Sequence, residues 1–163
     1  MEVNNPIASV ETNNQQLLEA YVQKPEKMKY YQEGLNKMKH SGMFTFAWHW
    51  SWWAFFGGWA FLLYRKAYIP ALVAFLVMSF AGSIIPVFGY LVGMILLGGS
   101  SAYFVLKRFD ELENTLSGTP EDKARAMQSL GGYHTWVIWL MVGLIGLSLL
   151  GFLMLGLFIT SSF

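Results

Sequence analysis

The sequence predicts an all-α membrane protein with three transmembrane helices, an aromatic interfacial or re-entrant segment, and short amphipathic cytoplasmic helices. Hydrophobic residues make up 55% of the 163-residue chain. Two stretches, residues 67–106 and 126–163, carry no charged side chain, and each exceeds the ~20 apolar residues that cross a hydrocarbon core. All eleven lysines and arginines lie outside these stretches, in blocks at 24–39, 65–66 and 107–125. This composition places the chain in the membrane class.

The N-terminal region, residues 1–43, is predicted to be cytoplasmic and to contain an amphipathic helix over about 25–41. Apolar side chains recur there at three- and four-residue intervals, largely apart from the lysines, and Gly42 ends the pattern. Residues 1–14 are expected to be disordered, and a weaker turn of helix follows at 17–22. The basic helix fits two interpretations equally well: it lies on anionic lipid, or it packs on the protein's own cytoplasmic part.

Residues 44–64 form an aromatic segment in which eleven of the twenty-one side chains are aromatic. From Phe44 to Trp52 aromatic residues alternate with other residues, and this period of two is typical of extended backbone. Residues 53–64 suit a helix of about three turns, which is too short to span a bilayer. Extended backbone at membrane depth must be buried against protein, so we expect the segment to pack on the hairpin that follows. One aromatic-rich spanning helix is the alternative.

The positions of the cations favour an aromatic segment that does not cross the membrane. If residues 44–64 crossed, five cationic residues would lie on one side of the membrane and six on the other. If the segment enters and returns, or lies in the interface, all eleven are cytoplasmic, as the positive-inside rule requires. The prediction is therefore three spans, with the N-terminus cytoplasmic and the C-terminus outside.

Residues 67–106 are predicted to form a transmembrane hairpin. As one helix they would be ~60 Å long, which is about twice the thickness of a hydrocarbon core. Pro86 has no N–H for a helical hydrogen bond and disfavours helical geometry at Ile85. The sequence therefore predicts two helices, over about 67–84 and 87–106, with a break at Ile85 and Pro86.

The cytoplasmic connector, residues 107–132, should contain two helical parts. The first continues the hairpin to about Leu116. The second begins at Thr119, whose hydroxyl can cap the helix, with Pro120 in the first turn, and it ends at the glycine pair 131–132. Residues 133–163 are then the C-terminal transmembrane helix, which runs to about Thr160.

Two sets of residues are predicted to contact the membrane or other helices. Tryptophan, tyrosine and flanking cations favour the headgroup level, while small residues let helices approach closely in lipid. Packing within one chain is the simpler explanation of the glycine spacing, and the Gly98–Gly99 pair is also interpreted as a close-packing site. The membrane-interface set is Trp48, Trp50, Trp52, Trp53, Trp59, Tyr64, Arg65, Lys66, Trp136 and Trp139, and the helix-packing set is Gly89, Gly93, Gly143, Gly146, Gly151 and Gly156.

Residues 52–68 read WWAFFGGWAFLLYRKAY. This resembles the signature of the DUF2628 family, bacterial inner-membrane proteins of unknown function: an aromatic run, glycine, an aromatic residue, then Tyr-Arg-Lys before a hydrophobic hairpin. The likeness continues through GSSAYFVLKRFDEL and covers roughly residues 30–139. It departs at Ser51, where the family usually has asparagine, and at Trp59, where it usually has proline. The resemblance implies a bacterial inner-membrane location, but it implies no reaction, cofactor or catalytic residue.

His49 is the one polar residue that stands out as a functional candidate. The ten acidic residues all lie outside the predicted spans, which argues against a proton-coupled transporter. The absence of cysteine excludes disulfides and thiolate metal sites. His49 is the only ionisable residue among the aromatic residues, although a structural histidine is the commoner outcome at such a position. We expect no catalytic residue, cofactor or metal site.

The leading functional hypothesis is a non-enzymatic membrane protein that acts by contact, as an accessory subunit, assembly factor or scaffold. Its expected partners are the lipid bilayer and a membrane protein or a second copy of the chain, with no nucleic acid. An oligomeric small channel or permease is the alternative, since three spans rarely enclose a pathway. A membrane enzyme acting on lipid is the third and least favoured hypothesis.

Overall fold

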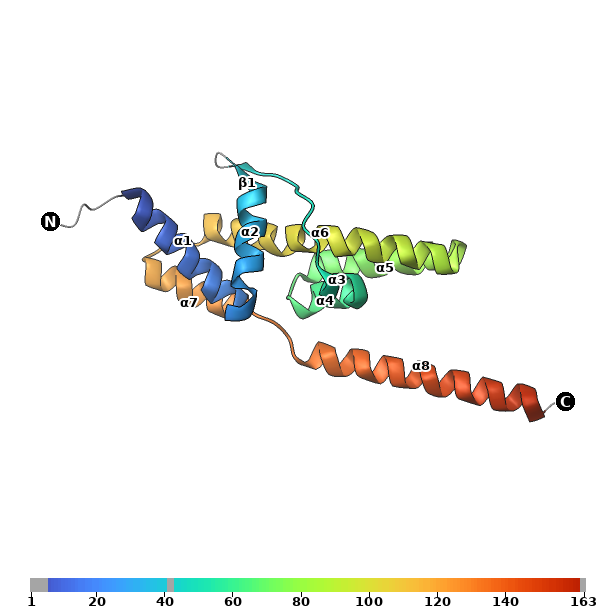
Figure 1. Ribbon diagram of the computed structural model, residues 1–163. Coiled ribbons are helices and arrows are strands. Elements are labelled where there is room, and N and C mark those ends of the chain that lie inside the picture. The colour runs from blue at the N-terminus through green and yellow to red at the C-terminus, as the bar shows by residue number, and fades with distance from the viewer. Residues whose placement is uncertain (1–5, 41–42, 162–163) are drawn as a thin grey trace. The chain divides into compact units, whose positions relative to one another are not determined.

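The computed structural model describes residues 6–40 and 43–161 (Figure 1). Eight α-helices, one 3₁₀ helix and one two-stranded hairpin are found among these residues, so the predicted helical class is confirmed. The chain divides into two compact units, Met1–Tyr133 and His134–Phe163, and each is described by itself.

The N-terminal region of the first unit contains more helix than the sequence predicted. Helix α1 covers Pro6–Val22, so the expectation of disorder over 1–14 is wrong from Pro6 onward, and residues 1–5 lie outside the described part. Leu17, Leu18, Tyr21 and Val22 are buried. They anchor the C-terminal half of α1, and adding turns to a formed helix costs little compared with nucleating one.

The predicted amphipathic helix over 25–41 is shorter than expected. Its first turn is the 3₁₀ helix η1, Pro25–Lys27, and helix α2 covers Met28–Met38. A short antiparallel pair follows, β1 (Lys39–His40) and β2 (Met43–Phe44). The predicted stop at Gly42 lies outside the described residues.

The aromatic segment is not one helix. Residues 45–51 belong to no helix or strand, and two six-residue helices follow: α3, Trp52–Gly57, and α4, Trp59–Tyr64. Gly58 separates them with a φ of +54°, a left-handed conformation that glycine adopts at little cost. A non-helical stretch before the helices is confirmed, with extended backbone at Ser51, whereas the single three-turn helix after it is wrong. The alternative of one continuous spanning helix is also wrong.

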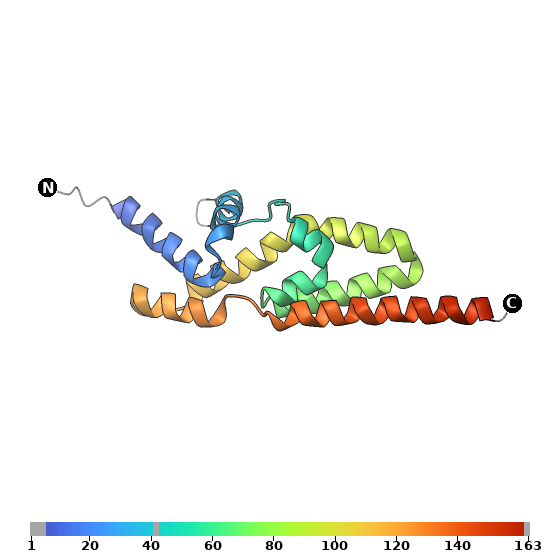
Figure 2. The ribbon, with the colours of Figure 1, turned by 60° about the horizontal axis from the view of Figure 1, so that its bottom comes forward.

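The hairpin agrees closely with the prediction. Helix α5 covers Tyr68–Ile84 and helix α6 covers Pro86–Thr115, with the break at Ile85. The two helices lie side by side (Figures 1 and 2). By length and composition, α6 and the C-terminal helix α8, Trp136–Ser161, can cross a membrane, while α5 is a shorter apolar helix of 17 residues.

The connector helix α7 covers Pro120–Leu130. Thr119 and Asp122 form a capping box, in which each side chain binds the other residue's backbone N–H. The predicted start at Thr119 and the end before the glycine pair are confirmed. Helix α7 packs against α1, and the core of the first unit lies where α1, α2, α4, α6 and α7 meet; its fully buried side chains include Leu18, Met38, Leu62, Leu106, Phe109 and Met127.

Candidate membrane-contact site and its anchors

The extended part of the aromatic segment is hydrogen-bonded to helix α6. The His49 N–H donates to the Gly99 carbonyl over 3.0 Å, and the Ser51 N–H donates to the Gly98 carbonyl over 2.7 Å. Because alternate N–H groups of an extended chain point the same way, one edge of this stretch can bind consecutive carbonyls of the helix. These bonds satisfy backbone groups that would be costly to bury unpaired.

The Gly98–Gly99 pair is the surface on which two tryptophans rest. A Cβ built on Gly98 would lie 2.9 Å from the Trp50 ring, and one built on Gly99 would overlap the Trp48 ring. Only glycine leaves room for both indoles at this distance from the helix. The interpretation of this pair as a close-packing site is confirmed, and the aromatic segment is what packs there.

His49 points away from those indoles and is buried, with 7% of its surface exposed. One ring nitrogen lies 3.0 Å from the Tyr30 carbonyl oxygen, and the imidazole packs on the Tyr30 ring with centroids 4.3 Å apart. A Cβ on Gly34 would come within 3.2 Å of the imidazole. Burial lowers the pKa of His49, and the hydrogen bond to Tyr30 opposes this only in part. These contacts hold residues 45–51 against α2. They are contacts of the kind that a histidine with a structural role makes.

Arg65 anchors the other end of the aromatic segment. Only 4% of its surface is exposed. Its Nε donates to the Tyr31 hydroxyl over 2.8 Å, and its Nη1 donates to the Val22 carbonyl over 3.0 Å. Val22 is the last residue of α1, so the guanidinium caps the negative end of that helix. This corrects the expectation that the Arg65 side chain faces the membrane surface.

Three side chains cap the C-terminal end of α7 in the same place. Gln23 Nε2 donates to the Gln128 carbonyl, Lys66 Nζ donates to the Ser129 carbonyl over 3.4 Å, and Arg108 Nη2 donates to the Leu130 carbonyl over 3.4 Å. Of these three, the cations Lys66 and Arg108 are also favourable near the negative end of the helix dipole. We call this meeting of the α1 and α7 ends with residues 65–66 and Arg108 the helix-end junction.

Backbone geometry at the helix-end junction is unusual. Gln23 and Lys66 are the non-glycine residues with positive φ among those described, at 54° and 59°. Each follows a helix end, where glycine is the common choice. Glycine has no side chain, whereas the side chains of Gln23 and Lys66 donate to carbonyls of α7. Gly132, at φ +79°, brings its N–H within 2.7 Å of the Tyr21 carbonyl. No sequence pattern predicted this junction, because its residues come from four separate elements.

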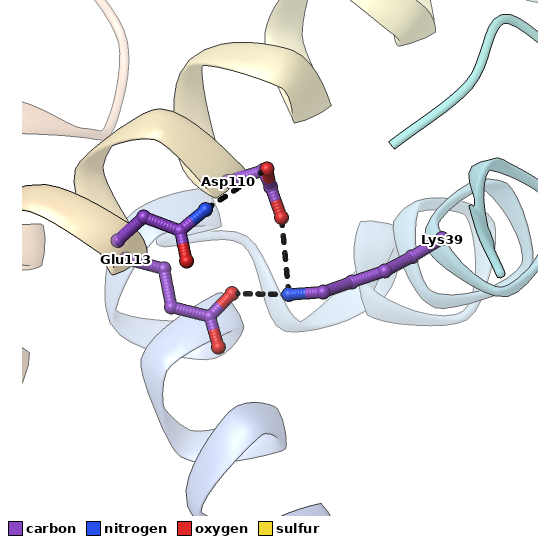
Figure 3. A network of polar contacts seen from close by, with 4 residues as sticks. Lys39, Asp110 and Glu113 are labelled. Atoms are coloured by element: carbon purple, nitrogen blue, oxygen red, sulfur yellow. Dashed lines mark hydrogen bonds and ion pairs between the residues drawn. The ribbon is translucent and has the colours of Figure 1, made fainter. Parts of the chain in front are cut away.

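Ion pairs join a residue before the aromatic segment to residues that follow the uncharged part of the hairpin. Lys39 Nζ lies 3.0 Å from Asp110 Oδ1 and 2.8 Å from Glu113 Oε2 (Figure 3). Burial disfavours the ammonium, but the hydrogen bonds with the two carboxylates outweigh it and raise the pKa of Lys39. Lys39 precedes the aromatic segment, whereas Asp110 and Glu113 follow the hairpin. The polypeptide therefore leaves this ion-pair cluster at residue 39 and returns to it by residue 110.

The predicted interface residues differ in their surroundings. Trp59 packs on Phe75 and Tyr64 stacks on Tyr133, with ring centroids 5.1 and 5.2 Å apart. Trp50 is half-buried. The exposed members of the set are Trp48, Trp52, Trp53, Trp136 and Trp139.

The predicted helix-packing glycines fall into two groups. The structure places Gly89 and Gly93 against α5, where added Cβ atoms would lie 2.5 Å from the Ala81 carbonyl oxygen and 3.1 Å from Met78. In the described part of the second unit, nothing lies within 4 Å of a Cβ built on Gly143, Gly146, Gly151 or Gly156. Because a helix turns by roughly 100° per residue, these four glycines do not share one stripe.

Among the described residues, no group of three or more His, Asp or Glu side chains could hold a metal ion. No curated protein matches the chain, and no solved structure matches it. A sequence model of the family described as "Protein of unknown function (DUF2628)" matches residues 11–108. The match begins earlier than the resemblance over 30–139 suggested, and it ends at the second residue of the connector. It includes residues 11–22 of α1, the aromatic segment, Arg65 and the Gly98–Gly99 pair. With more than half of its length matched, the chain belongs to the DUF2628 family.

Proposed function

We propose that this protein is a multi-pass protein of the bacterial cytoplasmic membrane that acts without catalysis, through helix–helix and membrane-surface contacts. Its role is that of an accessory subunit, assembly factor or scaffold of a membrane complex. The observation that carries the proposal is helix α8: 26 residues without a charged side chain, apolar on every side, in a unit of its own. Such a helix is suited to a lipid or helical environment rather than to water.

The apolar surface of the hairpin supports the same proposal. Exposed side chains follow both arms, among them Ile69 on α5, with 79% of its surface exposed, and Val87 on α6, with 84% exposed. Contiguous apolar surface of this kind marks a membrane or protein contact. Seventeen residues of α5 lie at the short end of the range that can span a bilayer, and adjoining residues 85–87 extend the apolar stretch.

We propose three spans, α5, α6 and α8, with the aromatic segment re-entrant or interfacial and the N-terminus cytoplasmic. The ion pairs of Lys39 with Asp110 and Glu113 support this topology. Residues on opposite sides of a bilayer could not make these contacts, which supports a topology in which residue 39 and residue 110 lie on the same side. An aromatic segment that crossed would separate them. The bond from Arg65 to the Val22 carbonyl supports the same assignment for residue 65.

The contact role can be tested because the chain has no cysteine. Single cysteines placed along α8 at Gly143, Leu144, Gly146 and Leu147 would carry a benzophenone photocrosslinker in native membranes. We expect crosslinks to a membrane protein or to a second copy at some of these positions and not at their neighbours, because a helix interface recurs every three to four residues. Lys123→Cys, on the cytoplasmic helix α7, is the control for position.

Two outcomes would contradict the contact role. One is that no tested α8 position gives a crosslink, and that detergent extracts contain only the monomer without a partner. The other is a defined oligomer that carries ion or solute flux in liposomes, which would support a channel instead.

A further inference from the structure

Five cations of the first unit lie over aromatic rings, and of these Arg65 is buried and Lys107 pairs with Glu111, which leaves Lys24, Lys27 and Arg108. Lys24 Nζ is 4.5 Å from the centroid of the Tyr133 ring and 5.6 Å from that of Tyr64, which stack on each other. Lys27 Nζ is 5.7 Å from the Trp53 ring, and the Arg108 guanidinium carbon is 5.5 Å from the Tyr68 ring. We call these cations and their rings the basic–aromatic belt. It draws on η1 and its flank, α3, α4, α5 and α6, so the fold rather than one sequence motif assembles it.

The cations of the belt make no ion pair with a carboxylate in the part of the chain whose side chains are described. In residues 13–40 and 43–160, ion pairs with acidic side chains involve Lys39 and Lys107, and none involves Lys24, Lys27 or Arg108. Hydrogen bonding with Tyr64 raises the pKa of Lys24, so its ammonium stays charged. Ring faces attract a cation without cancelling its charge. The belt therefore keeps a positive potential on its outer side.

The belt lies where the apolar surface of the hairpin begins. Tyr68 is the first residue of α5, and Ile69, directly after it, starts the exposed apolar surface. Arg108 follows the last uncharged turn of α6 on the returning arm. Trp53 is 69% exposed and supplies the amphipathic ring that favours the headgroup level. A lipid that covers this apolar surface would bring its headgroup to the cations.

We propose that the basic–aromatic belt binds the phosphate groups of anionic phospholipids, with Lys24 and Lys27 as the main contacts and Arg108 beside them. The inference rests on the membrane location in the proposed function and names the lipid class that this surface takes. A lysine ammonium over a ring can pair with a phosphate on its open side, while the lipid's acyl chains lie along α5 and α6. A zwitterionic headgroup gains less, because its own cation faces the same ammonium groups.

The test uses the full chain reconstituted in vesicles of equimolar phosphatidylcholine and phosphatidylglycerol, then extracted in a neutral detergent. Native mass spectrometry measures the ratio of the two lipids that stay bound. Basic residues near an anionic surface each contribute about fivefold to binding, so we expect Lys24→Gln/Lys27→Gln to lower the phosphatidylglycerol preference about 25-fold. Lys24→Arg/Lys27→Arg should retain it.

The matched control is Lys29→Gln/Lys37→Gln, which removes the same charge from two exposed lysines of α2. It should retain the preference. An equal loss in the control, or no loss in the belt variant, would overturn the assignment. If the unmodified chain shows no phosphatidylglycerol preference, the lipid assignment is wrong and an acidic protein segment becomes the ligand class to test. Photocrosslinking along α8 reports the contact role separately, so either proposal can fail without the other.

Discussion

The aromatic segment and helix α8 are both apolar, both carry tryptophans and both were candidates for membrane helices, yet they fold differently. The aromatic segment is an extended stretch and two short helices, tied to α6 at Gly98–Gly99 and to α1 and α2 through Arg65. Helix α8 is one uninterrupted helix. Apolar composition therefore does not distinguish the two segments, whereas glycine positions and a few polar anchors decide whether a segment continues as a helix.

The largest expected effect comes from breaking the anchor at the end of the aromatic segment. Arg65→Met should lower the free energy of unfolding by about 4 kcal/mol, because it leaves the Tyr31 hydroxyl and the Val22 carbonyl without charged donors in a buried site. Denaturant titration in mixed micelles measures this. Arg65→Lys should recover only part of the loss, since an ammonium cannot reproduce both bonds. A change below about 1 kcal/mol for Arg65→Met would show that the anchor is unimportant.

Alkaline pH should affect the first unit and spare α8. Burial, the largest influence, raises the pKa of Tyr21 from 10.0 to about 12. Below pH 10 both the folded and unfolded states hold the proton. Above it the unfolded state ionises first, so stability should fall between about pH 10 and 12, by up to about 3 kcal/mol. Helix α8 contains no titratable side chain.

The measurement for this prediction is unfolding monitored against pH for the unmodified chain and for Tyr21→Phe. The variant loses the hydroxyl bond to the Val105 carbonyl at every pH, but its stability should fall less steeply above pH 10. Parallel pH curves for the two proteins would contradict the assigned cause.

Matched glycine substitutions compare the two regions directly. Gly99→Ala should destabilise the first unit by about 2 kcal/mol, because the added methyl group overlaps the Trp48 ring and forces it to move. Gly146→Ala on α8 should leave unfolding of the first unit unchanged and slightly favour the helix. Equal effects of the two substitutions on stability would remove the proposed role of the glycine pair.

The smallest effect is expected at the ion-pair cluster. Lys39→Gln should cost about 1 kcal/mol, since the pairs with Asp110 and Glu113 are only partly shielded from solvent. Lys37→Gln removes the same charge from an exposed position and is the control. A double-mutant cycle with Glu113→Gln should give a coupling energy of the same order, and additive effects would contradict the contact.

Much of the fold could be predicted from the sequence where a local rule decides it. Pro86 ends one helix and starts the next, Thr119 and Pro120 start α7, and the alternation from Phe44 to Trp52 indicates extended backbone. The break at Gly58 was missed, because glycine is also tolerated inside helices that tertiary packing supports. The turn of helix at 17–22 was expected, but the earlier part of α1 was missed, because it is largely polar and its helical state depends on burial of the C-terminal half.

The anchors of the candidate site were harder to foresee. Arg65 beside Lys66 at the end of an apolar run is typical of a membrane-flanking cation, and only the folded structure shows that α1 ends against it. The junction combines residues 23, 65–66, 108 and 128–132, and single-sequence periodicity contains no information on such long-range pairs. The Gly98–Gly99 pair could be recognised as a packing site, but its partners could not be named.

Paired cysteine labelling tests most directly the proposal that the aromatic segment does not cross the membrane. In the cysteine-free chain, Lys37→Cys precedes the segment, Lys123→Cys follows the hairpin and Ser83→Cys marks the hairpin tip. In right-side-out vesicles, a membrane-impermeant maleimide should label Ser83→Cys and leave the other two unlabelled until the vesicles are opened. Labelling of either Lys37→Cys or Lys123→Cys, but not both, from outside would place them on opposite sides and contradict the account.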